Sequence, residues 1–264
     1  MKILVLRAPK ETLDEADPYI DEFRKAGLNA EGLDVLSFQF INQDILREKL
    51  LHPENYSGLV FTSPRGVVSV AQCFEKAVDD LKSWSVLPSY VVGEGTAQVL
   101  REKLALSSFG KESGNAGELA QYICHVHKPE ISKPLLFPSA ELKRNILLNS
   151  LIDAGIAVDC VTSYKTVPHP QLSMMLQNIF QSSAPKPDCL VFFSPSGARA
   201  ALSVLKKVGV NFEIMQMVAI GPTTEAAIID EGFSVFATAS KPSPTGLLEA
   251  INGARSNAQD AGMA

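Results

Sequence analysis

The stretch VFTSPRGVVSV at residues 60–70 returns as VFFSPSGARAA at residues 191–201. In both copies a short apolar run ends at Ser-Pro, and a glycine follows two residues after the proline. Serine before proline is typical of a helix N-terminus, because the hydroxyl caps the helix and proline suits its first turn. Each copy therefore predicts a buried strand that leads directly into a capped helix.

Two further motifs repeat in the same order. In the first pair of motifs, Phe61 and Phe192 are 131 positions apart. Gly93 of VVGEGTA and Gly221 of VAIGPTTEA are 128 positions apart. Gly117 and Gly246 are separated by 129 positions. A nearly constant offset indicates that about half of the chain is duplicated. The alternative is that the strand ends of all parallel α/β proteins look alike.

Short apolar runs alternate with amphipathic stretches along the whole chain. Each run is too brief for a buried helix and is typical of a strand buried on both faces. This alternation predicts an α/β fold of parallel sheets covered by helices. The expected strands are 3–6, 32–36, 59–62, 90–92, 135–137, 158–166, 190–193, 217–220 and 235–237, and the expected helices include 19–28, 66–81, 117–127, 142–156 and 223–233.

Length and apolar content suit two domains. The chain has 264 residues, of which 46% are hydrophobic, enough for two cores of ordinary size. Polar or proline-containing stretches at 37–42 and 167–171 permit two crossings between domains. We expect a discontinuous first domain of residues 1–36 and 171–254, a second domain of residues 40–166, and a disordered tail at 255–264.

Composition excludes several classes of partner. The formal net charge of −5 gives no general basic surface for nucleic acid or an anionic membrane. No apolar stretch approaches the roughly 20 residues of a membrane span, and the start MKILVLR is expected to be a strand and no signal peptide. The four cysteines lack CxxC spacing and are expected to be small buried hydrophobes, which favours a reducing compartment such as the cytosol.

Cofactor motifs are absent from the sequence. VVGEGTA lacks the third glycine of a dinucleotide fingerprint, and no GxxxxGK[ST] or GxSxG motif occurs. The four histidines are not spaced as metal ligands. The sequence therefore predicts neither a nucleotide cofactor nor a metal.

The repeated motifs all fall where a strand ends and a helix begins, the edge at which open parallel sheets bind ligands. Free N–H groups at a helix N-terminus bind anions, so an anionic ligand is the functional interpretation. The alternative is that these are only well-capped helices with solvated charges. The candidate hydroxyl residues are Thr62, Ser63, Thr96, Ser194, Ser196, Thr223 and Thr224, and the candidate basic residues are Arg65, Lys143, Arg144, Lys165 and Arg199.

Seven motifs in order, FTSPRG, YVVGEGTA, GNAGELAQYIC, PLLFPSAELKR, SYKTVPHP, FFSPSG and AIGPTT, make the chain resemble the uroporphyrinogen-III synthases, most closely those of animals. The resemblance extends from the N-terminus to about Leu248. It implies two flavodoxin- or Rossmann-like α/β domains joined by a two-stranded connector, with a cleft between them. It also implies an enzyme without metal or organic cofactor that converts the linear tetrapyrrole hydroxymethylbilane into uroporphyrinogen III in haem biosynthesis.

The resemblance also assigns roles to particular residues. Tyr164 of SYKT matches the family's connector tyrosine and is the candidate general acid, although it could instead be a packing residue at the hinge. Ser139 of PSAELKR joins Thr62, Ser63, Arg65 and the other hydroxyl candidates as substrate-binding. We expect a monomer, at most in transient contact with neighbouring pathway enzymes. The alternatives are a hinged two-domain protein that binds an anionic small molecule and an aldo-keto or nucleotide-sugar enzyme on a Rossmann scaffold.

Overall fold

A computed structural model gives the fold and describes residues 1–9, 17–74, 78–127, 133–141 and 146–262. The chain forms two compact units. Unit 1 consists of Met1–Ser37 and Val167–Ala264, and unit 2 consists of Phe38–Thr166.

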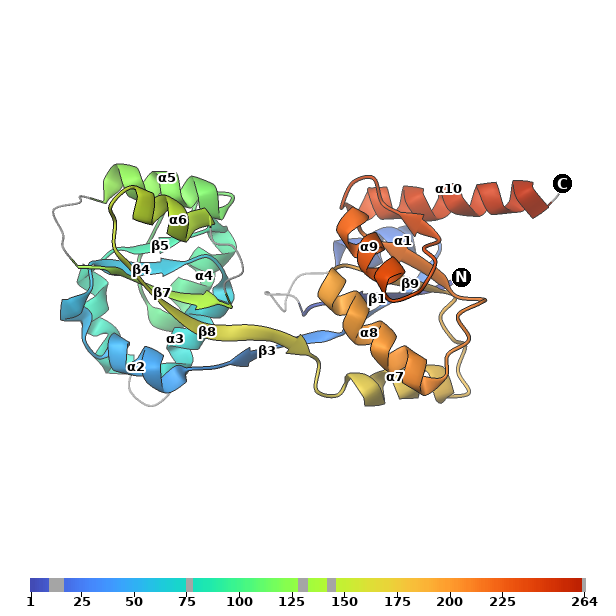
Figure 1. Ribbon diagram of the computed structural model, residues 1–264, viewed down its shortest axis with the longest axis horizontal. Coiled ribbons are helices and arrows are strands. Elements are labelled where there is room, and N and C mark those ends of the chain that lie inside the picture. Colours follow the sequence, from blue (N-terminus) through green and yellow to red (C-terminus); the bar gives the residue numbers. More distant parts are fainter. Residues whose placement is uncertain (10–16, 75–77, 128–132, 142–145, 263–264) are drawn as a thin grey trace. The chain divides into compact units, whose positions relative to one another are not determined.

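Unit 1 is built on a parallel sheet with the strand order β11-β10-β9-β1-β2. Helices lie on both sides of this sheet (Figure 1). Its strands are β1 Lys2–Arg7, β2 Asn29–Asp34, β9 Cys189–Phe192, β10 Gln216–Ala219 and β11 Ala237–Thr238, and its helices are α1 Pro18–Lys25, α7 Leu172–Gln181, α8 Pro195–Val208, α9 Pro222–Asp230 and α10 Pro244–Gly262.

Strand β1 shows why the unit has two helical layers. Its apolar side chains alternate, so that Ile3 and Val5 pack in a cluster with α1 and α10, and Leu4 and Leu6 pack in a second cluster with α7, α8 and α9. All four side chains are at most 1% exposed. Four consecutive apolar residues in a strand must be covered on both faces, which confirms the prediction of a sheet between helices.

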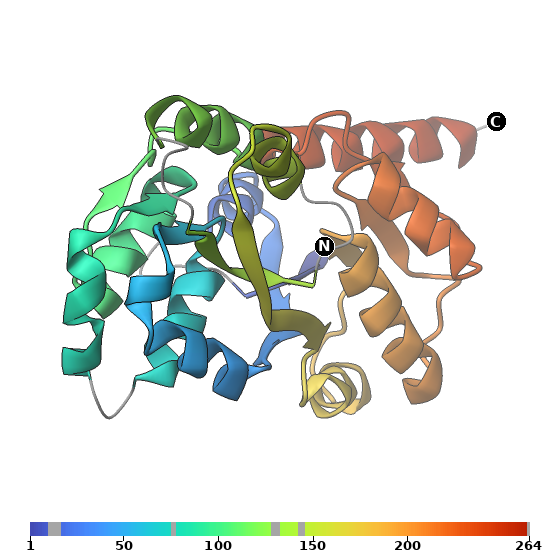
Figure 2. The ribbon, with the colours of Figure 1, turned by 60° about the vertical axis from the view of Figure 1, so that its left-hand side comes forward.

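Unit 2 contains a sheet with the order β3-β8-β7-β4-β5-β6. Strands β4 to β8 pair in parallel, and Figure 2 shows the helices around them. The strands are β3 Leu36–Phe40, β4 Gly58–Phe61, β5 Ser89–Val91, β6 Ser108–Phe109, β7 Leu135–Ala140 and β8 Val158–Pro168, and the helical segments are α2 Gln43–Leu50, η1 Pro53–Asn55, α3 Pro64–Cys73, η2 Val78–Val86, α4 Gly93–Leu104, α5 Ala116–Val126 and α6 Ile146–Asp153.

The two units share one topology. Strands β9, β10, β11, β1 and β2 of unit 1 take the same neighbours as β4, β5, β6, β7 and β8 of unit 2. The strand register agrees as well. Leu4 pairs with Leu190 in unit 1, and Leu136 pairs with Leu59 in unit 2. Leu59 and Leu190 are 131 positions apart, the same offset as Phe61 and Phe192. The arrangement is consistent with the predicted duplication, with β1-α1-β2 of unit 1 supplied by the start of the chain.

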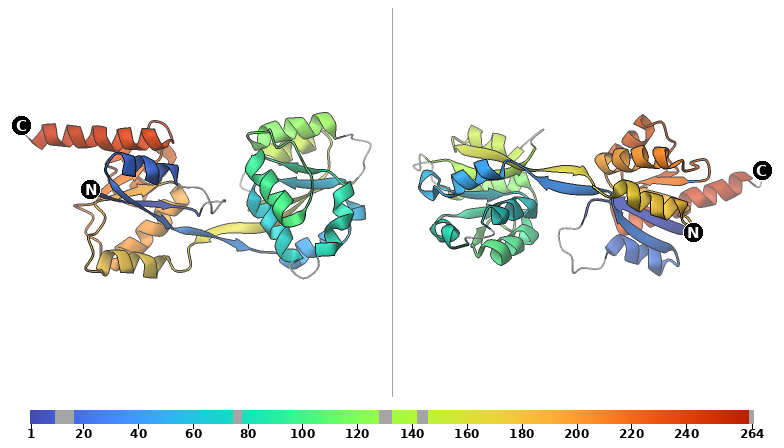
Figure 3. Two further views of the ribbon diagram at one scale, coloured as in Figure 1. Left: turned by 180° about the vertical axis from the view of Figure 1, so that it is seen from behind. Right: turned by 90° about the horizontal axis from the view of Figure 1, so that it is seen from below.

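The chain passes between the units in two paired strands, β3 and β8 (Figure 3). The Ile41 amide donates to the Ser163 carbonyl, and the His169 amide donates to the Val35 carbonyl. These bonds join the beginning of one strand to the end of the other, so the pair is antiparallel. The segment 37–42 had been expected to interrupt regular structure, and most of it is instead strand β3.

Some expectations were wrong in detail. The strand expected at 235–237 is β11, which begins at Ala237. Helix α10 continues to Gly262, through most of the stretch 255–264 for which disorder had been expected. No proline follows Pro244 in this helix and alanine recurs in it, so its composition favours a helix. Cys124 is exposed, whereas all four cysteines had been expected to be buried.

Candidate active site

The topology selects one position in each sheet as the candidate site. The order of strands reverses between β9 and β1 in unit 1, and between β4 and β7 in unit 2. Ligands of open parallel sheets bind outside the carboxyl ends of the strands at such a switch point. The residues that leave these strand ends are therefore the first candidates.

In unit 2, strand β4 leads through Thr62 into helix α3. Ser63 caps this helix, since its hydroxyl oxygen accepts the Arg65 amide at 3.3 Å. Helix α3 begins so close to β7 that a Cβ at Gly66 would lie 2.8 Å from the Pro138 carbonyl oxygen. The glycine of the repeated motif thus lets the start of α3 approach the end of β7, where Ser139 lies.

Arg65 lies at the second position of α3 and is half-buried. Its guanidinium carbon is 3.6 Å from the centroid of the Phe38 ring, which belongs to strand β3. This distance is that of a cation–π stack. A planar guanidinium presents paired N–H donors that match a carboxylate, so Arg65 is suited to anion binding at the unit 2 switch point.

Tyr164 lies on β8 beside the end of β7. The register slips here, because Ser139 pairs with Thr162 whereas Ala140 pairs with Tyr164, which leaves Ser163 as an extra residue. Such a bulge re-aims the side chains next to it. Tyr164 is 5% exposed, so its phenol lies within the protein, next to the strand end that carries Ser139.

The helices that follow β5 and β10 start differently. Neither Val92 before α4 nor Gly221 before α9 makes a side-chain capping bond within the described residues. The first amides of these helices are therefore more available to a ligand than those of α3 and α8. Thr96 in the first turn of α4 and Thr224 in that of α9 are buried, and Thr223 is exposed.

In unit 1, strand β9 leads into α8 in the same way as β4 leads into α3. The Ser194 hydroxyl accepts the Gly197 amide at 3.1 Å and lies 3.4 Å from the hydroxyl of the exposed Ser196. Ser63 and Ser194 both precede a proline at the first helical position. The prediction of two capped helices is confirmed.

Arg7, which ends strand β1 at the unit 1 switch point, is not among the site residues predicted from the sequence. Its Nη2 atom is 2.6 Å from Oδ2 of Asp17, and the two side chains are 16% and 9% exposed. Asp17 also caps α1 by accepting the Tyr19 and Ile20 amides. The signal was a basic residue directly after a buried strand, in LVLR.

Asp34, which pairs with Arg7 in the sheet register, adds a second carboxylate to this strand end. Burial raises its pKa, and the charges of Arg7 and His169 act in the opposite direction. The Arg7 charge is thus already matched by carboxylates of unit 1.

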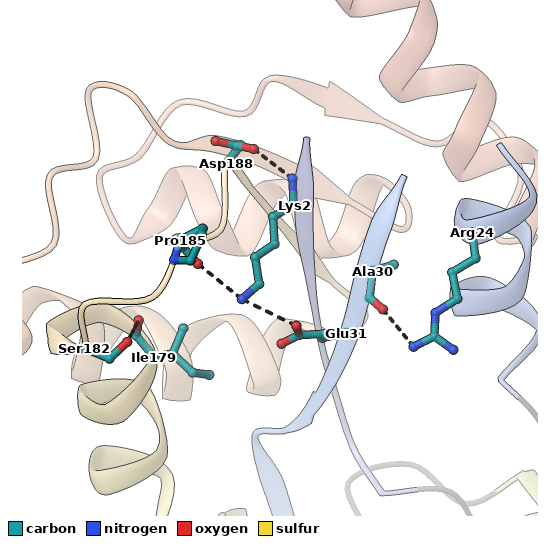
Figure 4. A network of polar contacts seen from close by, with 8 residues as sticks. All are labelled: Lys2, Arg24, Ala30, Glu31, Ile179, Ser182, Pro185 and Asp188. Atoms are coloured by element: carbon teal, nitrogen blue, oxygen red, sulfur yellow. Dashed lines mark hydrogen bonds and ion pairs between the residues drawn. The ribbon is translucent and has the colours of Figure 1, made fainter. Parts of the chain in front are cut away.

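The amino edge of unit 1 is closed by polar contacts (Figure 4). The Lys2 amide donates to Asp188 Oδ2 at 2.7 Å, and the Lys2 ammonium donates to the Pro185 carbonyl at 3.2 Å and lies 3.4 Å from Glu31 Oε1. These contacts tie the starts of β1, β2 and β9 together. The charges at this edge have structural partners, which leaves the carboxyl edge as the candidate site.

The amino edge of unit 2 has a different character. A cavity of about 480 Å³ lies there, lined in part by Ser57, Pro88 and Tyr90. His127 lines it too and is 5% exposed, with its Nδ1 atom 3.3 Å from the Tyr90 hydroxyl. Burial lowers the pKa of His127, so the imidazole is neutral at pH 7.

Other predicted positions lie away from the switch points. Lys165 is half-buried on β8 next to Tyr164. Arg199 lies on α8, exposed, with its Nη2 atom 3.7 Å from Asp230. Thr96, like Thr223 and Thr224, lies one strand away from the reversal. Lys143 and Arg144 lie outside the described residues.

Two features are absent from the described part of the chain. Within these ranges, no group of three His, Cys, Asp or Glu side chains is arranged to hold a metal ion. Among the helices in the same ranges, none is long and apolar enough to cross a bilayer.

Comparison with known proteins gives consistent matches. A family model described as uroporphyrinogen-III synthase HemD matches residues 17–249. The uroporphyrinogen-III synthase of Schizosaccharomyces pombe is 27% identical over 243 residues, which cover 89% of this chain and 91% of the yeast protein. That of Saccharomyces cerevisiae is 26% identical over 221 residues, 76% of either chain. The crystal structure of uroporphyrinogen-III synthetase from Helicobacter pylori shares the fold, with a TM-score of 0.59 at 21% identity and coverage of 94% of this chain and 96% of the other.

Proposed function

This chain belongs to the uroporphyrinogen-III synthase HemD family, and we propose that the carboxyl edges of its two sheets bind and convert the substrate of that family. The chain is a cyclising lyase of haem and porphyrin biosynthesis. It converts hydroxymethylbilane into uroporphyrinogen III, with inversion of ring D and loss of water. The observation that carries the proposal is the repeated Ser-Pro helix start at both switch points, with Arg65 at the unit 2 edge.

The reaction needs few protein groups. The hydroxymethyl hydroxyl of ring A takes up a proton and leaves as water, which gives an azafulvene cation. The substituted carbon of ring D attacks this cation and forms a spiro-pyrrolenine. Fragmentation of the spiro centre and reclosure at the other side of ring D complete the inversion, with release of a proton. The electron-rich pyrroles drive these steps, so the main task of the protein is to orient them.

Tyr164 is the proposed general acid for the departing hydroxyl. Tyr164 lies on β8 and pairs with Ala140 at the end of β7, and this position supports the role. A buried phenol next to the site can donate a proton or a hydrogen bond without competition from water. Replacement of Tyr164 by Phe keeps the ring and removes only the hydroxyl, so we expect kcat to fall about 100-fold with no change of fold. A fall of less than about threefold would assign Tyr164 a packing role.

The carboxylates of the substrate are the proposed ligands of the helix starts. Hydroxymethylbilane carries acetate and propionate groups, eight carboxylates in all. The uncapped amides at the starts of α4 and α9 offer backbone donors, and Ser63, Ser139, Ser194 and Ser196 offer hydroxyls. Arg65 adds a planar cation. Because most of these donors are neutral, a chain with a net charge of −5 can still recognise a polyanion.

The deciding experiment supplies fresh hydroxymethylbilane and separates the oxidised products into type I and type III porphyrin isomers. The wild-type chain is expected to give mostly type III, and Thr224→Ala is expected to reduce the rate. Only type I, the product of spontaneous closure, together with saturable binding, would instead indicate a binding protein for an anionic small molecule.

We also propose a cytosolic monomer that works without a metal or an organic cofactor and makes at most transient contacts with neighbouring pathway enzymes. The dispersed cysteines without CxxC spacing support a reducing compartment. Light scattering during size-exclusion chromatography is expected to give 28.5 kDa. Activity is expected to survive dialysis against a chelator.

A further inference from the structure

The cavity at the amino edge of unit 2 has the size of a small-molecule site. Its volume is about 480 Å³, and pockets that hold small ligands measure about 300–1,000 Å³. Ser57, Pro88 and Lys133 line it, and each comes shortly before one of the parallel strands β4, β5 and β7. The candidate active site lies at the other, carboxyl end of these strands. The cavity is therefore a candidate site for a second ligand.

The lining of the cavity is mostly apolar. Leu87 and the aromatic ring of Tyr90 contribute to it. Val86 and Val126 line it as well, although they are 84% and 41% exposed. A ligand with an apolar body would remove this exposed surface from water, which is favourable. The apolar part of the cavity therefore favours an organic ligand over an inorganic ion.

Ser57 adds a hydroxyl group that lacks a partner. This residue is 3% exposed, and its Oγ atom has no hydrogen-bond partner in the described part of the chain. A hydroxyl that is removed from water without a compensating hydrogen bond destabilises the structure, so such groups are rare in folded proteins. An oxygen atom of a ligand in the cavity would supply the missing partner.

His127 presents a hydrogen-bond donor whose identity follows from its neighbour. Within the described ranges, the Tyr90 hydroxyl contacts one hydrogen-bonding atom, Nδ1 of His127, at 3.3 Å. Burial raises the pKa of Tyr90 to about 12, so the phenol keeps its proton at pH 7 and needs an acceptor for it. Nδ1 is that acceptor, and the neutral imidazole then carries its own hydrogen on Nε2. This Nε2–H group has no partner among the described residues.

Lys133 supplies a positive charge to the same cavity. Its side chain is exposed and forms no ion pair within the described residues. Glu54 lies within electrostatic range, but its carboxylate is already 3.0 Å from Nδ1 of His52. The cavity thus combines an imidazole N–H, a hydroxyl and an ammonium group, and none of its lining residues is acidic. This set of donors suits a carboxylate.

We propose that this cavity is a binding site for a small organic acid, whose apolar body lies against Val86 and Val126 and whose carboxylate accepts hydrogen bonds from His127, Ser57 and Lys133. The site goes beyond the proposed function and does not depend on it, because the ligand occupies the amino edge and leaves the carboxyl edge open. A ligand that binds the folded chain alone also stabilises it.

The test uses the full chain and 1-naphthoate, an aromatic carboxylate, with 1-naphthamide as a neutral probe of similar shape. Calorimetric titration at pH 7 should give a Kd of about 0.1–1 mM for 1-naphthoate and binding of the amide that is about tenfold weaker. Backbone amide resonances should shift near Ser57 and His127 rather than near Ser63 and Ser139. Equal affinities for the two probes, or shifts at the carboxyl edge alone, would overturn the proposal.

Three variants remove the donors one at a time. His127→Phe keeps a ring and should weaken 1-naphthoate binding about tenfold, and Ser57→Ala and Lys133→Gln should each weaken it about threefold. The matched control is Ser89→Ala. Ser89 is 1% exposed and its hydroxyl also lacks a partner within the described ranges, but it does not line the cavity. Its replacement should leave the affinity unchanged.

Thermal midpoints of the variants without ligand separate a loss of folding from a loss of binding, and Lys133→Gln changes only an exposed side chain. Wild-type affinity in both Ser57→Ala and Lys133→Gln would overturn the site. Competition between 1-naphthoate and hydroxymethylbilane would place the anion at the carboxyl edge and overturn it too. A chain that makes only type I isomer would refute the proposed function and leave this site intact.

Discussion

Each unit has an arginine at its switch point, and the contacts around the two arginines differ. Arg7 ends β1 in unit 1 and forms a close ion pair with Asp17, which itself caps α1. Arg65 follows β4 in unit 2 and stacks on an aromatic ring. The strand register makes Ser139 at the end of β7 the counterpart of Arg7 at the end of β1. The arginine therefore belongs to β1 in unit 1 but follows β4 in unit 2.

The two arginines differ in the contacts that surround them. The guanidinium of Arg7 is bound closely by the Asp17 carboxylate, whereas that of Arg65 has the Phe38 ring on one face. Duplication supplied the same strand ends twice, and the neighbours of each arginine assign it a task. We therefore expect Arg7 to matter for stability and Arg65 for substrate binding, and the following experiments test that division.

The largest expected effect is on activity in unit 2. Arg65→Ala removes a charged donor for a substrate carboxylate, so KM should rise about 10- to 30-fold while the thermal midpoint changes little. Arg7→Lys, which keeps the charge beside Asp17, is the matched variant of unit 1 and should leave KM nearly unchanged. Steady-state kinetics with hydroxymethylbilane measure both. Equal losses in the two variants would remove the division.

The second effect concerns the stability of unit 1. Arg7→Ala leaves the Asp17 carboxylate with little solvent and without its cation, and the free energy of unfolding should fall by about 2 kcal/mol. Asp17→Asn removes the charge but keeps a good N-cap, so the double variant Arg7→Ala/Asp17→Asn should recover part of the loss. Urea unfolding measures these differences. An unchanged midpoint for Arg7→Ala would contradict the structural role.

The third effect should be the same in both units. Ser63→Ala and Ser194→Ala each remove a capping bond to a helix amide and should cost about 1 kcal/mol. Asparagine at either position retains a cap and serves as the control. Calorimetry of the four variants tests whether the duplicated motif contributes equally. A clearly larger loss in one unit would show that its helix start has a further structural task.

The smallest effect is a response to pH at the amino edges. Burial lowers the pKa of His127 in the folded state, so below its ordinary value of about 6.5 the unfolded chain binds a proton that the folded chain resists. Stability from this residue is complete above that pH and falls as the pH drops through it.

Hydrogen exchange at pH 7.5 and 5.5, corrected for intrinsic rates, compares the two units directly. Protection should fall in unit 2 on acidification, more than in unit 1. His127→Asn removes the titrating group and should abolish the difference. A uniform response of both units would exclude His127 as its source.

The sequence predicted what depends on local pattern. The buried runs at 3–6 and 190–193 are strands, and Ser63 and Ser194 cap helices, because each of these features involves residues close together in the chain. The stack of Arg65 on Phe38 joins residues that are far apart, and no periodicity encodes it. The same is true of Gly66. The Pro138 carbonyl, which belongs to another strand, leaves no room for a Cβ at this position.

The site residues show the same limit. A pattern of hydroxyl residues at strand ends predicted that Thr96 and Thr224 belong to the edge, but not that both side chains are buried. Burial depends on the neighbouring helices, which a single strand end does not specify. Arg7 was missed for a related reason, because its importance depends on a carboxylate ten residues away.

The discontinuity of unit 1 has a consequence for its synthesis on the ribosome. Strand β1 lies between β2 and β9, and β9 begins only at Cys189. At about 5–20 residues per second, roughly 8 to 30 seconds pass between the emergence of β2 and that of β9. Throughout that time β1 exposes an unpaired apolar edge, a template for wrong pairing with other chains. The nascent N-terminal segment, rather than the finished enzyme, is therefore where a chaperone would be most needed.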